Sequence, residues 1–181
     1  MAEPVSDALL KLLGEWEGFE VERVETEAEG DDVFGAPAPR LVLVLRAKAD
    51  VPKRCSQCGA IVEKIHDVSE RRVRDLPLGE WDTWLVFPRV RLQCPRCGPT
   101  VEAVPWLDRY QRMTTRLAEK IARLAQALPI KQVAAWFGVG WDTVKQIDQR
   151  ALAGRLGAAE DHLDGIQRIA IDEFAIRRGH Q

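Results

Sequence analysis

Two short cysteine motifs constrain this chain more than any other feature. Cys55-Ser-Gln-Cys58-Gly and Cys94-Pro-Arg-Cys97-Gly have the same spacing, and each ends in a glycine that permits a tight turn around the sulfur atoms. Together they supply four thiolates, which is the ligand set of a tetrahedral structural Zn²⁺ site. The 35 residues between Cys58 and Cys94 leave room for β-strands between the two turns. The spacing therefore predicts a zinc ribbon.

The same cysteines are also compatible with two redox-active pairs or with four unconnected thiols. A redox pair of this spacing is typical of a βαβ setting, which surrounds neither motif. One zinc site accounts for all 4 cysteines and leaves no open coordination position, so we expect a structural metal rather than a catalytic one. The three histidines, His66, His162 and His180, are too scattered for a catalytic zinc site, and we expect them to be solvated.

Charge is distributed unevenly along the chain. Residues 1–52 hold 5 basic and 12 acidic residues, whereas residues 53–112 hold 11 and 8, and residues 113–156 hold 7 and 3. An acidic leader followed by two basic segments favours a nucleic-acid-binding protein. The sequence has no secretory signal and no apolar stretch of the roughly 18 residues that a membrane span needs. We therefore expect a cytoplasmic protein without a membrane partner.

The leader and the ribbon segment show strand patterns. In residues 1–52 we expect a short helix over 6–13, then strands over 19–24 and 41–46 that pair as a hairpin. In residues 53–112 we expect short strands over 71–76, 81–86 and 90–93 between the two cysteine motifs. Trp81, Trp84 and Phe87 are interpreted as core residues of this small domain rather than as platforms for stacked bases.

The apolar period becomes helical after residue 113. Leu117, Ile121, Leu124 and Leu128 recur on one helix face, with Thr114 or Thr115 as its cap and Pro129 at its end. Residues 130–150 then predict a helix-turn-helix. Small Ala134 lies where the helices touch, Gly138 can take a positive φ in the turn, and Gly140 caps the second helix. The apolar residues expected to seal the two helices together are Val133, Phe137, Val139, Val144 and Ile147.

The second helix of this unit carries the residues expected to contact DNA. In the major groove, Trp141, Asp142, Lys145, Gln146 and Gln149 would reach base edges or nearby phosphates. Thr143 and Arg150 would hold the DNA backbone. Six arginines of the ribbon segment are expected either to extend this footprint or to form a solvated charged face: Arg71, Arg72, Arg74, Arg89, Arg91 and Arg96. An ordinary helical hairpin is the alternative interpretation of residues 130–150.

The ordered combination resembles the bacterial insertion-sequence transposases of the ISL-three family. The residues that carry this resemblance are the four cysteines, the segment Leu128–Lys145, and Ile169-Ala-Ile-Asp172-Glu-Phe174 with Arg177-Arg-Gly-His180. It implies an α+β chain: a small α/β leader (1–52), a Cys₄ zinc ribbon (53–112), an all-α helix-turn-helix (113–157) and the first strand of a truncated RNase-H-like DDE domain (158–181). It also implies that Asp172 is the first acid of the DDE triad, whose carboxylates hold Mg²⁺ in the full-length enzyme.

The resemblance implies that this chain is the N-terminal part of a DDE transposase and binds the terminal inverted repeats at transposon ends. It also implies association with the bacterial nucleoid and a possible homo-oligomer. Because one carboxylate does not hold paired ions, we expect no catalysis from these 181 residues alone. Two alternatives remain open: a truncated stand-alone regulator that occupies transposon ends, and a zinc-ribbon adaptor that binds other proteins. Salt-sensitive DNA binding would argue against the adaptor.

Overall fold

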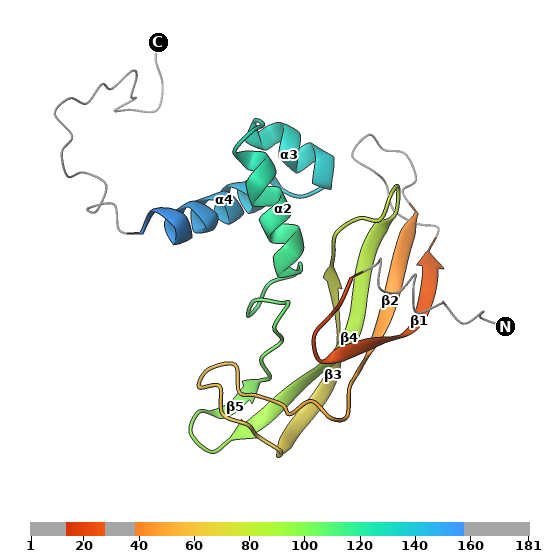
Figure 1. Ribbon diagram of the computed structural model, residues 1–181, viewed down its shortest axis with the longest axis vertical. Helices are drawn as coiled ribbons and strands as arrows, with labels where there is room; N and C mark the ends of the chain where they lie inside the picture. Colours follow the sequence, from red (N-terminus) through yellow and green to blue (C-terminus); the bar gives the residue numbers. More distant parts are fainter. Residues whose placement is uncertain (1–13, 28–38, 158–181) are drawn as a thin grey trace, which may run out of the picture.

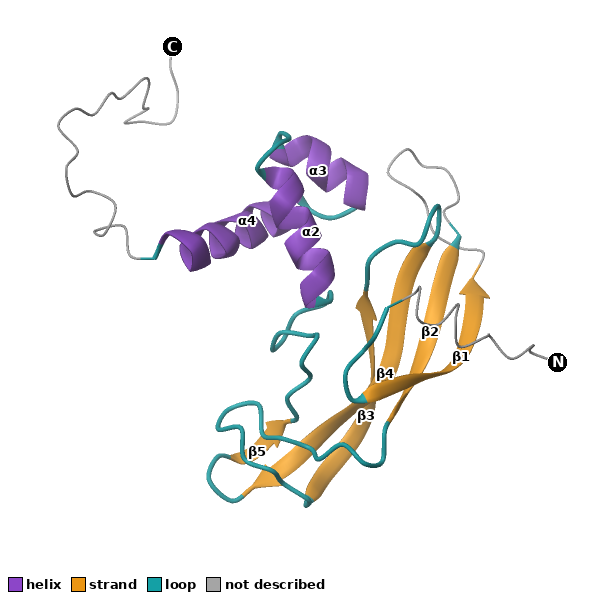
Figure 2. Cartoon of the chain, in the orientation of Figure 1, coloured by secondary structure: helices purple, strands orange, loops and turns teal. Residues whose placement is uncertain are grey.

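The computed structural model describes residues 14–27 and 39–157 and contains one mixed sheet and one three-helix bundle (Figure 1). The expected helix over 6–13 and the segment 158–181, which contains Asp172, lie outside the described residues. Figure 2 shows that strands occupy the first part of the described chain and helices the last. None of the described helices has the length and apolar character that crossing a membrane requires.

The sheet has five strands: β1 (Phe19–Glu27), β2 (Arg40–Ala47), β3 (Ile65–Arg74), β4 (Asp82–Cys94) and β5 (Gly98–Val101). Their order is β1-β2-β4-β3, with β5 paired to the far half of β4. The β1–β2 hairpin expected from the sequence is confirmed and is antiparallel. β2 then pairs with β4 in parallel, from Arg40 opposite Asp82 to Val44 opposite Val86. The leader hairpin and the ribbon strands therefore belong to one sheet, which spans the boundary expected at residue 52.

β4 is a single strand of 13 residues, although the sequence suggested separate strands over 81–86 and 90–93. Pro88 lies in its middle and cannot donate a ladder hydrogen bond. It is tolerated because pairing with β2 ends at Val86 and pairing with β5 begins at Arg91, so one side of β4 is open at Pro88. The prediction of two separate strands over 81–86 and 90–93 was therefore wrong.

The main core lies on one face of this sheet. Phe19, Leu43, Leu85 and Phe87 are at most 8% exposed and pack with Trp16 and Leu107. Phe19, Phe87 and Trp106 contact each other edge to face, with centroid separations of 5.0 to 5.6 Å. Phe87 is thus a core residue as expected. Trp84 is half-buried on the opposite face beside Val42, Val44 and Val86, and the expectation for Trp81 was wrong because its ring is exposed.

The helical bundle comprises α2 (Thr115–Ala125), α3 (Ile130–Phe137) and α4 (Trp141–Leu156). Thr114 is the N-cap of α2, as expected, and its hydroxyl accepts the Leu117 N–H. α2 ends at Ala125, and Pro129 serves as the N-cap of α3 instead of ending α2. The buried cluster includes Leu117, Ile121, Val133, Phe137, Val144 and Ile147. These are residues that the sequence placed between the helices.

Candidate metal centre and nucleic-acid interface

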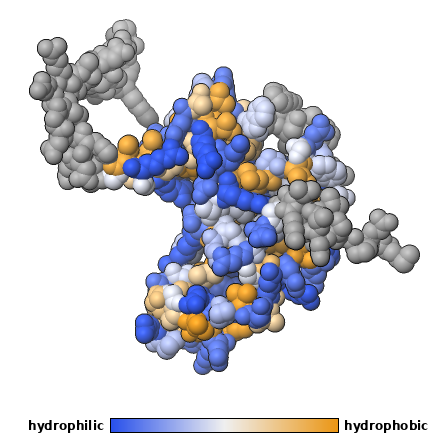
Figure 3. All heavy atoms as spheres, viewed as in Figure 1, coloured by the Kyte–Doolittle hydropathy of each residue, from blue (hydrophilic) through white to orange (hydrophobic). Residues whose placement is uncertain are grey.

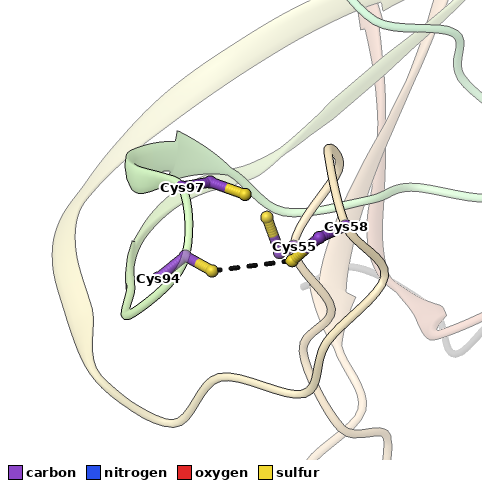
Figure 4. A group of neighbouring side chains, drawn as sticks. All are labelled: Cys55, Cys58, Cys94 and Cys97. Carbon is purple, nitrogen blue, oxygen red and sulfur yellow. Dashed lines mark hydrogen bonds between the residues drawn. The ribbon is translucent and has the colours of Figure 1, made fainter.

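The four cysteines converge at the end of the sheet furthest from the helices (Figures 1 and 4). All four Sγ atoms lie within 4.8 Å of one another, and the Cys58 and Cys94 Sγ atoms are 3.7 Å apart. A tetrahedral Zn²⁺ with bonds of about 2.3 Å to sulfur has ligand–ligand separations of about 3.8 Å. The distances between the four thiols therefore match one shared zinc site. Two separate redox pairs, or four unconnected thiols, would not require all four sulfur atoms to lie this close together.

Both cysteine turns have the same backbone construction. Gly59 and Gly98 follow the second cysteine of their motifs with φ of 70° and 71°, in the region that disfavours a side chain. The first turn is held to the second by β5, because the Ser56 N–H donates to the Val101 carbonyl at 3.1 Å and Cys55 bridges to Glu102. The strand after the second turn thus fixes the first one in place.

Without a bound metal, the surroundings of Cys55 and Cys97 shift the pKa values of these two thiols in opposite directions. Backbone N–H groups, first that of Cys58 and then that of Gln57, lower the pKa of Cys55 to about 6. The pKa of Cys97 is raised to about 12, chiefly by its hydrogen bond with Cys58 and by burial. A bound Zn²⁺ reverses this rise, because thiols that coordinate the metal are deprotonated. Cys55 and Cys94 are each 1% exposed, which shields half of the ligand set from water.

The α3–α4 turn has the geometry that the sequence predicts. Gly138 is left-handed, with φ 56° and ψ 40°, and the Val139 N–H returns to the Ala134 carbonyl at 3.0 Å. Gly140 is the extended N-cap of α4 but offers no side chain to the helix N–H groups. Ala134 is 8% exposed, so its small side chain lies between packed helices. This turn sets α4 across the bundle with one long face free.

The free face of α4 carries the residues that the sequence proposed for DNA contact. Asp142, Lys145, Gln146, Gln149 and Arg150 are exposed, and Thr143 is half-buried. The Lys145 ammonium lies 5.0 Å from the centroid of the Trp141 ring, a cation–π contact on the exposed surface. Arg150 donates to the Gln146 carbonyl at 3.2 Å. The face thus offers donors and acceptors, and no apolar layer from residues 14–27 or 39–157 covers them.

A buried carboxylate that the sequence did not single out joins the helices to the sheet. Asp75, 1% exposed, follows β3 and accepts hydrogen bonds from the Trp16 indole at 3.0 Å, the Thr114 hydroxyl at 2.6 Å and the Arg116 Nε at 2.7 Å. Its neighbour Arg74 donates to the Phe137 carbonyl at 2.5 Å and to Asp82 at 2.6 Å. No local periodicity indicates such a residue, because Trp16 and Arg116 lie 59 and 41 positions away.

The three histidines, Asp172 and the last two ribbon arginines complete the residues that the sequence singled out. His66 is exposed on β3, 3.9 Å from Asp67, and has no relation to the cysteines. His162, His180 and Asp172 lie outside the described residues. Arg96 is exposed beside the second cysteine turn, and Arg91 forms an ion pair with Asp67 at 3.2 Å.

Two domain families match the chain in the order of these two centres. The zinc-finger of transposase IS204/IS1001/IS1096/IS1165 matches residues 52–97, and the helix-turn-helix domain of transposase family ISL3 matches residues 102–152. The first match contains all four cysteines, and the second contains α2, α3 and most of α4. No solved structure matches the chain.

Whole-chain relatives give the same assignment. The chain is 41% identical over 174 residues to a transposase for insertion sequence element IS1001 of Bordetella parapertussis. It is 31% identical over 171 residues to a transposase for insertion sequence element IS1557 of Mycobacterium tuberculosis. These matches cover 96% and 94% of this chain but 40% and 37% of the relatives, so the chain spans about two fifths of their length. With both domains matched in order and this identity along nearly all of its residues, the chain belongs to the ISL3 family of insertion-sequence transposases.

Proposed function

We propose that this chain binds the terminal inverted repeats of its insertion sequence by placing α4 in the major groove. The observation that carries the proposal is the free face of α4, where hydrogen-bonding side chains project from a helix anchored through Val144 and Ile147. A helix of this kind fits the major groove of B-DNA, and its amide and charged side chains match the donors and acceptors of base edges.

The proposed roles divide along this helix. Gln146 and Gln149 are central on the free face and read base edges, because a glutamine amide pairs in a bidentate manner with adenine. Lys145, held beside the Trp141 ring, is close enough to the groove edge to contact a phosphate. Thr143 and Arg150 lie on one flank of the face and hold the DNA backbone. The cysteine site contributes by fixing the ribbon rather than by chemistry, since four thiolates saturate Zn²⁺.

We further infer that Asp172 supplies one of the carboxylates that hold Mg²⁺ during strand transfer in the complete transposase. The support is the resemblance of Ile169–Phe174 to the family's first acidic motif and the transposase relatives across this region. Bound beside Asp172 and further carboxylates, such ions would supply charge stabilisation for the attacking and leaving oxygens of the phosphodiester. Binding to DNA ends is independent of this carboxylate.

The test of base reading is the variant Gln146→Ala. We expect it to weaken binding to a duplex with the cognate inverted repeat by about 1–3 kcal/mol and to leave binding to scrambled DNA almost unchanged. Fluorescence anisotropy at fixed salt measures both. Gln57→Ala, an exposed glutamine on the first cysteine turn, is the matched control and should change neither. Equal losses on the two duplexes would remove Gln146 as a base reader.

A further inference from the structure

The free face of α4 borders a broad cleft whose opposite wall is the β3 edge of the sheet. The cleft has a volume of about 1200 Å³, and Thr143, Gln146 and Arg150 line it on the helix side. Five arginines of β2, β3 and β4 line the sheet side: Arg40, Arg72 and Arg74 on the face of Trp84, and Arg71 and Arg89 on the opposite face, that of Phe87. Arg112 also lines it, and the acidic lining residues are Glu80 and Asp82. Figure 3 shows hydrophilic residues gathered where the helical bundle meets the sheet. We call this surface the arginine cleft.

Several of these cations form no ion pair with the described residues. Arg72 is paired with Glu27 at 2.7 Å, and Arg74 is paired with Asp82. Within residues 14–27 and 39–157, by contrast, no ion pair engages Arg40, Arg71, Arg89 or Arg112. The Nε–H groups of Arg40 and Arg89 also find no acceptor in this part of the chain. The arginine cleft therefore has more guanidinium charge and donor capacity than its own carboxylates satisfy.

Two of the cleft arginines, Arg71 and Arg89, repel each other. Arg71 and Arg89 project from the same face of the paired strands β3 and β4, where Ser69 lies opposite Arg89 and Arg71 opposite Phe87. Burial, and then the neighbouring Arg89 charge, lower the pKa of Arg71. The Arg71 guanidinium also donates to the Gln111 carbonyl, which holds it in place. An anion between the two arginines would relieve their repulsion.

The two walls of the cleft are fixed to each other. Arg74 at the end of β3 donates to the carbonyls of Phe137 and Gly138, where α3 ends and the turn to α4 begins. Asp75 holds the start of α2 through Thr114 and Arg116. The sheet arginines and α4 are thereby presented together, without an ordering step when a ligand arrives.

We propose that the arginine cleft binds the phosphate backbone of the duplex beside the groove that α4 enters. The sheet then extends the protein's DNA footprint past the helix-turn-helix. This inference rests on the proposed function, because it requires α4 on DNA. It selects among the six ribbon arginines: Arg71, Arg72, Arg74 and Arg89 line the cleft, whereas Arg91 and Arg96 do not. A guanidinium suits this role because its planar fork matches two phosphate oxygens.

The phosphate backbone fits the arginine cleft better than an acidic protein segment does. Gln146 and Arg150 line the cleft on its helix side, so a duplex read by Gln146 brings its phosphates beside the cleft. Those charges repeat along the duplex about every 1.7 Å of helix axis, counting both strands. The sheet arginines, which project from both faces around the edge strand β3, give an extended set of cations.

The experiment compares two double variants of the zinc-loaded 181-residue chain. Arg40→Gln with Arg89→Gln removes two cleft charges whose residues form no ion pair among the described residues. Arg23→Gln with Arg46→Gln removes the same charge from the β1 and β2 side, away from the cleft. Binding to cognate and scrambled duplexes is followed by anisotropy over a series of NaCl concentrations, with Gln146→Ala in parallel.

We expect the cleft variant to reduce the slope of log K against log salt by about 1.8, or ~0.9 for each lost phosphate contact, on both duplexes. The control variant should keep the original slope. An unchanged slope for the cleft variant, with Gln146→Ala still selective for the cognate duplex, overturns the cleft inference and leaves the proposed function standing. Failure of every form, including the unaltered chain, to bind DNA overturns both. If the cleft variant instead loses only self-association in sedimentation, the cleft serves a second copy and the inference is wrong.

Discussion

At the scale of single residues, Asp75 is the side chain on which the joint between sheet and helices depends most. Its two carboxylate oxygens receive the Trp16 indole, the Thr114 hydroxyl and the Arg116 guanidinium. We expect Asp75→Asn to lower the free energy of unfolding by about 2–3 kcal/mol, because the amide turns donors toward donors and removes the negative charge beside Arg116. Urea unfolding followed by tryptophan fluorescence measures the loss.

The matched control for this change is Asp67→Asn. Asp67 pairs with Arg91 at the surface, where both side chains are more than 40% exposed. Water screens such a pair, so we expect a loss below about 1 kcal/mol. Comparable losses at Asp67 and Asp75 would show that burial of the Asp75 carboxylate does not increase its contribution to the free energy of unfolding.

At the scale of elements, the turn between α3 and α4 determines where the free face of α4 points. Gly138 has φ 56° and its carbonyl lies 3.4 Å from Arg74, so Gly138→Ala forces a left-handed alanine at the joint. We expect a loss of about 1–2 kcal/mol of stability, measured by thermal unfolding. Gly140→Ser is the contrasting change. Its backbone is extended at φ −63°, and a serine there can cap α4 and add a few tenths of a kcal/mol. A melting temperature that falls equally in both variants would contradict this assignment.

Local elements were predictable because their determinants are local. Thr114, Gly138 and the apolar spacing of residues 117–147 lie within a few residues of the structure that they specify. The cysteine turns likewise depend on two cysteines and one glycine each. The parallel pairing of β2 with β4 has no comparable signal in the sequence. The two strands would show the same apolar pattern if β2 belonged to a separate hairpin and β4 to a separate ribbon. The sequence offered the ribbon arginines as candidates for DNA contact but did not indicate which of them share a cleft with α4, and it did not single out Asp75, because these contacts join distant segments.

At the scale of the whole molecule, the zinc site and the helical bundle are separate centres of stability. The cysteines pack with Val62, Val90 and Leu92, whereas the helices have their own buried cluster. We expect a strong chelator to release about one Zn²⁺ per chain, to expose four reactive thiols and to leave the helical circular-dichroism signal largely intact. Thiol titration and far-ultraviolet spectra measured together test this. Helical signal lost in step with zinc would show that the two centres unfold as one unit.

The parallel pairing of β2 with β4 also bears on how this region can be divided or exchanged. A fragment cut at residue 52 would keep both cysteine turns but remove the neighbour of Thr83, Leu85 and Val86. The inner strand β4 would become an edge strand with unpaired backbone amides and newly exposed apolar side chains, which is a template for aggregation. A zinc finger excised by its cysteine spacing alone would therefore precipitate, and recombination between related elements would be tolerated only where the leader and the cysteine turns are inherited as one block.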